Sequence, residues 1–545
     1  MSEDRGMEKN YLLALFLSLI VFAGYLFFVQ KYYPKQTVPP PVVEKSSAFP
    51  DAPSLESKAA LTPAENEPAP AILRYANNLY EIEFSTLGAS VTRLLYRGEA
   101  GQHVTETLFY EGEPSSAGIF GLRLLHEETD LTKAVFKLTR HGQQNEIFEF
   151  VYERPEAYRL TKRYVLDPAK PDIGLDVVFE NLSPREKHFP AEFTFGINYH
   201  FVDQASAHNF QVVTLAEKVE SQNLQTILKK GFFLSKETAW TGILKHYFAL
   251  LVKPDWKTLS VESEADDKSF WATLRMEPLS LAAGGKITRH FLIYAGPQRY
   301  EILKSFDVEF ENILSRGFFG LFKIWLLLAL KFCDRFVHNF GWAIILLTLG
   351  IKLLFTPLTH MSFESMKKMQ ALAPKLKSLQ ERYKSDPAKL NREMMELYRR
   401  NRVNPMMGCL PMLLQIPIFI SFYQVLSETI ELKGAPFLFW IHDLSEPDRL
   451  FRFPQALPFL GWDAFNLLPL FMIASMVWQQ KLTPQAGTTP EQTKIMNFMP
   501  LIFGFMFYNM PSGLVLYWFV NNMLSIIHQV FVKRMVIVLH HEDRE

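Results

Sequence analysis

A single lysine lies inside an apolar stretch that is long enough to cross a lipid bilayer. Residues 336–363 are FVHNFGWAIILLTLGIKLLFTPLTHMSF, and Lys352 is the only Lys, Arg, Asp or Glu among them. About 20 apolar residues span the hydrocarbon core of a bilayer, so this stretch predicts a transmembrane helix, which Pro357 is expected to end. An ammonium group in such a helix costs at least ~2.5 kcal/mol unless it finds water or a polar partner. Lys352 must therefore either snorkel to the headgroups or face a polar cavity.

Five further charge-poor runs predict membrane spans. One lies near the N-terminus, at residues 11–29, and we expect residues 1–30 to form an uncleaved anchor because no small-residue cleavage site follows the run. In the C-terminal half the expected spans are residues 337–358, 406–428, 464–480, 494–509 and 512–532. The sequence therefore predicts a polytopic α-helical membrane protein with six transmembrane helices.

The orientation of these spans follows from one basic loop. Between residues 364 and 402 there are eleven Lys and Arg against five Asp and Glu, although formal charges cancel over the whole chain. The positive-inside rule places this short loop in the cytoplasm. Counting spans from it puts both termini in the cytoplasm and residues 72–315 in the periplasm. A further span at residues 321–330 would reverse the N-terminal half, but Lys323 and Lys331 leave that run too short. We expect residues 316–335 to form an amphipathic interfacial helix instead.

The basic loop is itself expected to fold as a cytoplasmic helical hairpin over residues 360–404. Apolar residues recur there at three- and four-residue steps, and Ser385-Asp386-Pro387 predicts a turn between two helices. Two interpretations stay open for this hairpin. It is either a solvated linker or a docking arm for a ribosome or an incoming chain, because basic surfaces attract RNA and anionic lipid.

The region before the membrane half has a different pattern. Residues 31–71 are rich in Pro, Ala, Ser and Glu, which predicts an extended linker. Residues 72–315 contain short alternating segments bounded by Gly, Pro and Asn, for example 79–84, 147–153, 159–166, 173–180 and 287–296. This pattern predicts a large, mostly antiparallel all-β sandwich. No phosphate loop, nucleophile motif or metal-spaced histidine cluster occurs in its sequence, so we expect no cofactor, metal or catalytic residue and interpret the domain as a scaffold.

Polar side chains within the predicted spans favour a hydrated cavity around the lysine. They are Thr348, Gln415, Asn466, Asn497, Asn521 and Asn522. Polar groups in hydrocarbon seek one another or water. Neither the charge-free run of residues 403–427 nor any of the other predicted spans holds an Asp or Glu, which an ion-coupled transporter usually needs. An unpaired cation in a polar cavity would instead attract an acidic, extended substrate, and we favour this role over snorkelling.

Several motifs in the last third of the chain resemble the bacterial YidC membrane protein insertases. They are GWAIILLTLGIKLLFTPLT, NREMMELYRRNRVNP, MGCLPMLLQIPIF, APFLFWIHDLS, QTKIMNFMPLIF and PSGLVLYW, in that order within residues 315–535. The resemblance implies a five-helix insertase core over residues 336–535, built around a hydrophilic groove. It also implies that residues 72–315 form a periplasmic supersandwich like that of galactose mutarotases. The residues after Arg534 are few and mixed in charge, so we expect residues 536–545 to form a short cytoplasmic tail.

The resemblance also implies where substrate is contacted. The groove cation of the family falls on Lys352, where arginine is usual, and the groove threonine falls on Thr348. The substrate-contacting aromatic, often a tyrosine, falls on Trp518 beside Tyr517. Further polar positions in the expected groove are Gln415 and Asn521. The implied partners are nascent membrane proteins, the Sec translocon (SecYEG and SecDF), membrane lipids and, through the hairpin, the ribosome.

The function predicted from these observations is membrane protein insertion and folding at the bacterial inner membrane, without a catalytic cycle. Two alternatives follow from other features. The expected mutarotase likeness allows a membrane-anchored carbohydrate-binding or epimerase-like enzyme. Several polar spans also allow a small-solute channel. Five spans beyond the anchor exceed what an anchored enzyme requires, which favours the insertase.

Overall fold

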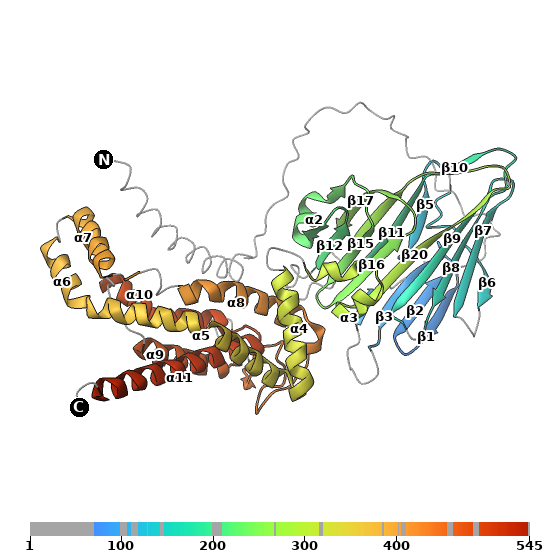
Figure 1. Ribbon diagram of the computed structural model, residues 1–545. Helices are drawn as coiled ribbons and strands as arrows, with labels where there is room; N and C mark the ends of the chain where they lie inside the picture. The colour runs from blue at the N-terminus through green and yellow to red at the C-terminus, as the bar shows by residue number, and fades with distance from the viewer. Residues whose placement is uncertain are drawn as a thin grey trace. The chain divides into compact units, whose positions relative to one another are not determined.

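The computed structural model describes residues 70–98, 106–110, 118–127, 129–141, 146–168, 170–198, 210–265, 269–315, 320–383, 386–401, 403–404, 410–454, 462–482 and 490–542. The expected N-terminal span and nearly all of the linker lie outside these residues. Internal contacts separate a mainly β unit, which ends at Ile313, from a helical unit, which begins at Leu314. The two units are drawn in Figure 1 and are described one at a time.

The β unit consists of twenty described strands and three short helical segments. They are β1 (Ile72–Ala76), β2 (Tyr80–Ser85), β3 (Ser90–Tyr96), β4 (Glu106–Tyr110), β5 (Gly121–Leu124), β6 (Lys137–His141), β7 (Ile147–Arg154), β8 (Tyr158–Leu166), β9 (Asp172–Asn181), β10 (Lys187–Phe189), β11 (Ala191–Asn198), β12 (Phe210–Leu215), β13 (Val219–Asn223), α2 (Leu224–Lys230), β14 (Phe232–Leu234), β15 (Trp240–Lys245), β16 (Phe248–Pro254), β17 (Thr258–Ala265), β18 (Ser269–Met276), β19 (Leu279–Leu281), β20 (Lys286–Pro297), α3 (Tyr300–Ser305) and η2 (Phe310–Ile313). All strand pairs recorded among the described residues of this unit are antiparallel, as the alternating sequence pattern predicts.

Three sheets carry the architecture of the β unit. The largest has nine strands in the order β13-β12-β15-β16-β20-β9-β8-β7-β6. A five-stranded sheet has the order β14-β17-β18-β11-β5, and a four-stranded sheet has the order β1-β2-β3-β4. Burial alternates along β8, because successive side chains of a strand point to opposite faces. The buried face of β8 contributes Tyr164, whose ring lies 5.0 Å from the ring of Phe84 on β2.

One residue on the buried face of β8 is a lysine. The side chain of Lys162 is fully buried, and its Nζ donates hydrogen bonds to the carbonyl oxygens of Gly88 (2.9 Å), Ala89 (2.9 Å) and Phe120 (2.7 Å). Ala89 and Phe120 have φ values of 44° and 64°, which are uncommon for residues with a side chain. Burial lowers the pKa of Lys162 to about 7. The ammonium group thus joins two turns in left-handed conformations inside the core.

The helical unit contains the predicted membrane half. Its elements are α4 (Gly320–Val337), α5 (Phe340–Ala371), α6 (Ala373–Arg382), α7 (Pro387–Arg400), α8 (Leu410–Glu428), η4 (Ile430–Leu432), β21 (Phe451–Arg452), β22 (Ala464–Phe465), α9 (Leu468–Leu482), α10 (Pro490–Phe507) and α11 (Ser512–Glu542). Two segments among the described residues are long and apolar enough to cross a membrane, Phe340–Ala371 and Ser512–Phe531. Met496–Phe507 is a shorter apolar helix.

Helix α5 is longer than the sequence predicts. Pro357 was expected to end the helix, yet α5 continues through it to Ala371. Threonine hydroxyls beside the proline donate to backbone carbonyls one turn earlier, from Thr356 to Lys352 (2.8 Å) and from Thr359 to Phe355 (2.8 Å). Transmembrane helices tolerate proline where such side chains satisfy local carbonyl groups. The helix therefore extends past the predicted end of the span.

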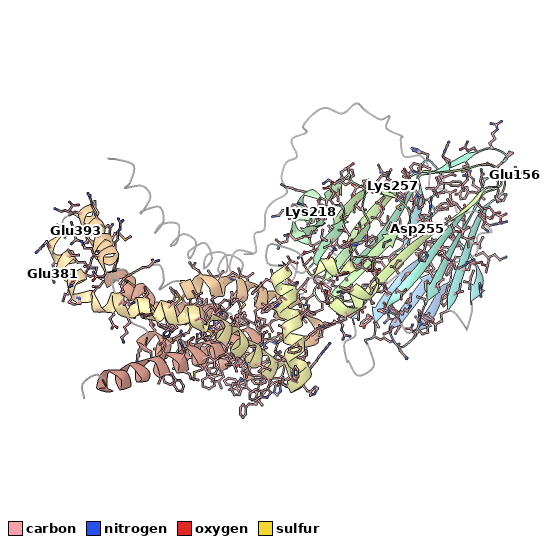
Figure 2. All side chains as sticks on the ribbon, in the orientation of Figure 1. Glu156, Lys218, Asp255, Lys257, Glu381 and Glu393 are labelled. Carbon is pink, nitrogen blue, oxygen red and sulfur yellow. The ribbon has the colours of Figure 1, made fainter. Side chains whose placement is uncertain are left out.

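Helix α6 ends at Arg382 and α7 begins at Pro387, and the Asp386 amide donates to the Tyr383 carbonyl at 3.0 Å. Ser385, the first residue of the predicted turn, lies outside the described residues. The Asp386 carboxylate accepts a hydrogen bond from the Lys389 amide (3.1 Å), which caps the start of α7. A small apolar cluster holds the segment together and consists of Met369, Leu372, Leu376, Tyr398 and Val403 with Met394 and Leu397 packed against it. Figure 2 labels Glu381 on α6 and Glu393 on α7, and most of the charged side chains of these helices are exposed.

Candidate functional site

The amine of Lys352 is bound by polar groups of a neighbouring helix. Its Nζ lies on α5 and donates to the Ser525 hydroxyl at 2.6 Å and, over a longer distance of 3.4 Å, to the Asn521 amide oxygen. Both partners lie on α11. No ion pair to Lys352 is recorded within the described part of the chain. Among the described residues, the positive charge is therefore held by neutral groups, and no carboxylate compensates it.

Helical spacing brings these partners together. Tyr517, Asn521 and Ser525 follow one another at four-residue steps, so they lie on the same side of α11. The Ser525 hydroxyl also donates to the backbone carbonyl of Asn521 at 2.7 Å. Ser525 did not stand out in the sequence as a site residue. Its position one turn after Asn521 is the signal that could have identified it.

A second polar contact joins α8 to the same side of α11. The Gln415 side-chain amide donates to the Tyr517 hydroxyl, and Tyr517 is buried. The Tyr517 ring stacks on the ring of Phe422 at a centroid distance of 4.6 Å. The two polar contacts thus connect α5, α8 and α11, and they include four of the expected site residues, Lys352, Gln415, Tyr517 and Asn521. We call Lys352, Gln415, Tyr517, Asn521 and Ser525 the polar cluster.

Thr348 and Trp518 stand in different surroundings. The Thr348 hydroxyl is buried one turn before Lys352 and donates to the carbonyl of Ile344 in its own helix at 2.6 Å. Trp518 is half-buried and packs against aromatic rings of α8 and α10, namely Phe419, Phe503 and Phe507. No recorded hydrogen bond joins either residue to the polar cluster among the described residues. Trp518 belongs to an aromatic cluster that lies beside Tyr517 along the chain.

Other polar residues of the predicted spans form separate contacts. Asn522 donates to the Ser475 hydroxyl of α9 at 3.0 Å. Asn466 donates to the Tyr508 carbonyl at 2.6 Å, at the start of α9. The Gln480 amide donates to the carbonyl of Met496 on α10 at 2.7 Å. These contacts join α9 to α10 and α11 and have the character of helix–helix hydrogen bonds.

Helix α4 exposes apolar residues on one side, and two of its lysines form ion pairs with α8 and η4 of the same unit. Its exposed side chains recur at three- and four-residue steps and are Leu321, Trp325, Leu328, Phe332 and Phe336. Lys323 is buried and forms an ion pair with Glu428 at the end of α8. Lys331 pairs with Glu431 in η4 at 2.5 Å. An apolar outer surface with paired lysines on the inner side is suited to contact with lipid.

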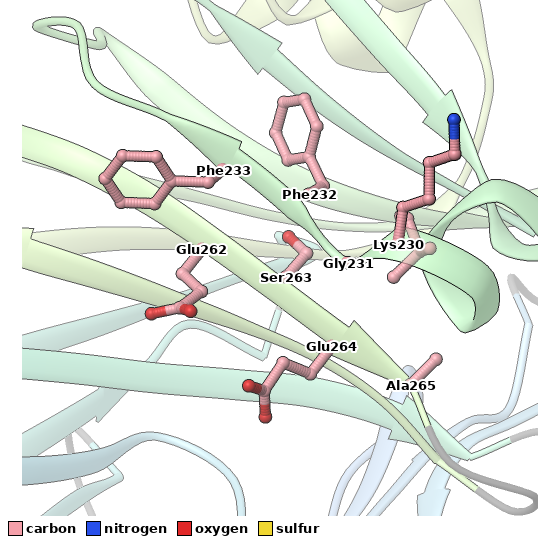
Figure 3. Close-up of a pocket in the computed structure, with 9 residues that line it drawn as sticks. Lys230, Gly231, Phe232, Phe233, Glu262, Ser263, Glu264 and Ala265 are labelled. Carbon is pink, nitrogen blue, oxygen red and sulfur yellow. The ribbon is translucent and has the colours of Figure 1, made fainter. Parts of the chain in front are cut away.

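The β unit has a surface pocket of about 420 Å³, shown in Figure 3. It is lined by α2, β14 and β17, and its residues include Lys230, Phe233, Glu262 and Glu264. Glu262 pairs with Phe233 across the strands, and Glu264 lies two residues further along the same face. A carbohydrate-binding or epimerase-like activity would have these carboxylates at its disposal. Within the described residues no group of three or more His, Cys, Asp and Glu could hold a metal ion.

Comparison with known proteins identifies the family of this chain. A model described as YidC periplasmic domain matches residues 73–328, and one described as 60Kd inner membrane protein matches residues 332–539. The chain is thus an inner-membrane protein with a periplasmic β domain and a helical membrane core. The membrane protein insertase YidC of Geobacter metallireducens is 33% identical over 97% of this chain and 99% of its own length. The chain belongs to the YidC family of membrane protein insertases.

Two further proteins of the same family are similar to this chain. The membrane protein insertase YidC of Campylobacter jejuni is 37% identical over 63% of this chain and 60% of its own length. A crystal structure of an active YidC insertase, with its first transmembrane domain resolved, is 18% identical and covers 84% of this chain and 91% of that chain, with a TM-score of 0.37.

Proposed function

We propose that this chain inserts nascent membrane proteins into the bacterial inner membrane along a polar path beside Lys352. The observation that carries the proposal is the uncompensated ammonium group, held between α5 and α11 by Ser525 and Asn521. A lysine has three N–H donors, and two are directed to these oxygens. The remaining donor and the net charge are available to an acidic residue in the translocated flank of a substrate.

The proposed mechanism requires no covalent chemistry. Polar groups within the membrane lower the free energy of carrying a charged or polar flank across hydrocarbon. The apolar segment of the substrate then moves into lipid, because burial of apolar surface is favourable by about 25 cal/mol per Å². Lys352, Gln415, Tyr517 and Asn521 would line the path, with Thr348 and Trp518 at its margins. The role of the protein is to stabilise an intermediate position, and the hydrophobicity of the substrate supplies the driving force.

The proposed topology has six transmembrane helices and a five-helix core within residues 336–535. Both termini lie in the cytoplasm, and residues 72–315 form a periplasmic supersandwich. The basic charge of residues 364–402 supports this orientation. Under this topology, α6 and α7 present exposed lysines and arginines to the cytoplasm, where a ribosome or anionic lipid can bind them. Association with SecYEG and SecDF belongs to the same proposal.

The proposal is tested by replacing the cation in the full-length chain. Lys352→Ala should reduce the insertion of a single-span substrate with an acidic translocated flank, measured by protease protection in proteoliposomes. Lys352→Arg should retain insertion, because the charge is preserved even though its geometry changes. Leu354→Ala is the matched control, since Leu354 is exposed on the same helix two residues away. If Lys352→Ala inserted the substrate as efficiently as wild type, the cation would be dispensable.

A further inference from the structure

The segment between α8 and α9 carries an aromatic residue that is almost fully exposed. Phe439 is 85% exposed, and its neighbour Leu438 is also exposed. Phe439 has a φ of 58°, a left-handed backbone conformation that is unusual for a residue with a bulky side chain. Phe451, on the nearby strand β21, is 51% exposed. Residues 438–440 are called the aromatic tip below.

The aromatic tip is fixed in place by hydrogen bonds to a buried carboxylate. Trp440 stacks on Phe439 and donates its indole N–H to the Asp448 carboxylate at 2.8 Å. Asp448 is buried and also accepts from the amides of Leu467 (2.9 Å) and Leu468 (2.8 Å) at the start of α9. A backbone hydrogen bond of 2.9 Å from the Phe437 amide to the Ile441 carbonyl closes the turn. Phe439 is therefore exposed on a turn that hydrogen bonds hold in place.

The same segment is attached to the first turns of both candidate membrane spans. Asn339 caps α5, and its side-chain NH₂ group donates to the carbonyl of Pro436 at 3.0 Å. The ring centroids of Phe437 and Trp342 lie 5.7 Å apart. At the start of α11, the amides of Ser512 and Gly513 donate to the carbonyls of Glu446 (2.7 Å) and Leu444 (2.9 Å). The aromatic tip is thus tied to the level at which two spanning helices begin. That level of a membrane is the headgroup interface, where aromatic side chains are enriched.

We propose that the aromatic tip inserts into the periplasmic lipid interface and fixes the depth of the helical unit in the membrane. The proposal rests on the topology proposed above, which places the segment between α8 and α9 on the periplasmic side. Its occupant is the boundary between lipid headgroups and acyl chains. Phe439 and Leu438 enter this boundary, while Trp440 remains bound to Asp448. Phe451 forms a second contact with the same lipid layer.

Spin-label depth measurement tests this proposal. In the full-length chain with Cys333→Ala and Cys409→Ala, a nitroxide is attached at Phe439→Cys, and the protein is reconstituted into vesicles of phosphatidylethanolamine and phosphatidylglycerol. Collision rates with oxygen, which concentrates in lipid, and with a water-soluble nickel chelate are compared. The expected result is a several-fold higher ratio of oxygen to nickel collisions at residue 439 than at an aqueous control, Lys137→Cys, which is exposed on β6. A label at Leu354→Cys, exposed on α5, gives the lipid reference.

The outcomes separate this proposal from the insertase mechanism. Nickel collisions at residue 439 equal to those at residue 137 would overturn the proposal. Protection from nickel only while a substrate is being inserted would also overturn it, because the occupant would then be protein. The first measurement is made without substrate, and substrate is added only for the second comparison, so a failure of the first leaves the Lys352 experiment unaffected. The same measurement at Phe451→Cys provides a second site, which keeps the test decisive if Phe439→Cys fails to fold.

Discussion

The β unit and the helical unit each contain a lysine held by hydrogen bonds, and their partners differ. Lys162 is fully buried and donates to three backbone carbonyls, which matches the three donors of an ammonium group. Lys352 is half-buried and donates to two side-chain oxygens of one neighbouring helix. The first cation is saturated by groups that cannot move away, and it joins parts of a core. The second is held by side chains, and it keeps capacity for another acceptor.

The difference gives a criterion for separating a structural cation from a functional one. Carbonyl groups of tight turns are fixed by the backbone, so the free energy of the Lys162 site is spent on holding residues 88, 89 and 120 together. Serine and asparagine side chains can rotate, so the Lys352 site can exchange one acceptor for another at small cost.

The largest effect is expected from removing the saturated cation. Lys162→Met should destabilise the β unit by about 3–5 kcal/mol, because three buried carbonyls lose their donor. Hydrogen exchange of the β8 amides in the full-length chain measures the loss as faster exchange. Lys137→Met on exposed β6 is the control and should change exchange little. Unchanged protection of β8 in Lys162→Met would contradict a structural role.

The stability of the β unit should also depend on pH through the same residue. The pKa of Lys162 is lowered to about 7 in the folded chain from its usual 10.5, so between these values the unfolded chain binds more protons. Stability therefore rises with pH in this window, by about 2 kcal/mol between pH 7 and pH 9. Hydrogen exchange of β8, corrected for intrinsic rates, should show the rise in wild type and a flat profile in Lys162→Met. A rise of equal size in the variant would assign the effect to another group.

A smaller effect is expected from neutralising Lys352 without removing it. Ser525→Asp places a carboxylate where the hydroxyl now accepts from the ammonium group. If the substrate is attracted by the charge, insertion of a substrate with an acidic flank should fall roughly tenfold, equivalent to about 1.4 kcal/mol. Ser525→Asn keeps a neutral acceptor and serves as the control in the same proteoliposome assay. Equal insertion by the two variants would show that the net charge has no role.

The smallest effect is expected from removing the β unit. Deletion of residues 72–315 should leave insertion of a single-span substrate within about twofold of wild type, or about 0.4 kcal/mol, since the polar cluster lies wholly in the helical unit. Protease protection measures insertion, and membrane extraction of the truncated chain checks that it is integrated. A loss comparable to that of Lys352→Ala would place part of the activity in the β unit.

Local sequence patterns predicted the antiparallel β region and the long helix around Lys352, because such patterns depend on neighbouring residues. The alternation in residues 159–166 indicates the strand β8 and places Lys162 on the same face as Leu160 and Tyr164. It could not show what the lysine binds, because the acceptors lie 42 to 74 residues away along the chain. Its burial among apolar side chains depends on sheet packing that no local pattern encodes.

In the candidate site, too, the sequence predicted single residues but not their distant partners. A lone charge in an apolar run identified Lys352, whereas its closest partner, Ser525, lies 173 residues further along the chain. The prediction that Pro357 ends α5 was wrong, because proline removes one hydrogen bond but neighbouring threonine hydroxyls bind nearby carbonyls. Asn521 was identified from its polarity alone, and its contact with Lys352 depends on how α5 and α11 pack.

A charge-reversal experiment tests most directly whether the charge of Lys352 acts on the translocated flank of the substrate. Two substrates that differ only in an acidic or a basic flank are inserted by the wild type and by Lys352→Glu. If the charge acts in this way, wild type prefers the acidic flank and Lys352→Glu prefers the basic flank. The same order of preference in both proteins, whatever the total activity, would contradict it.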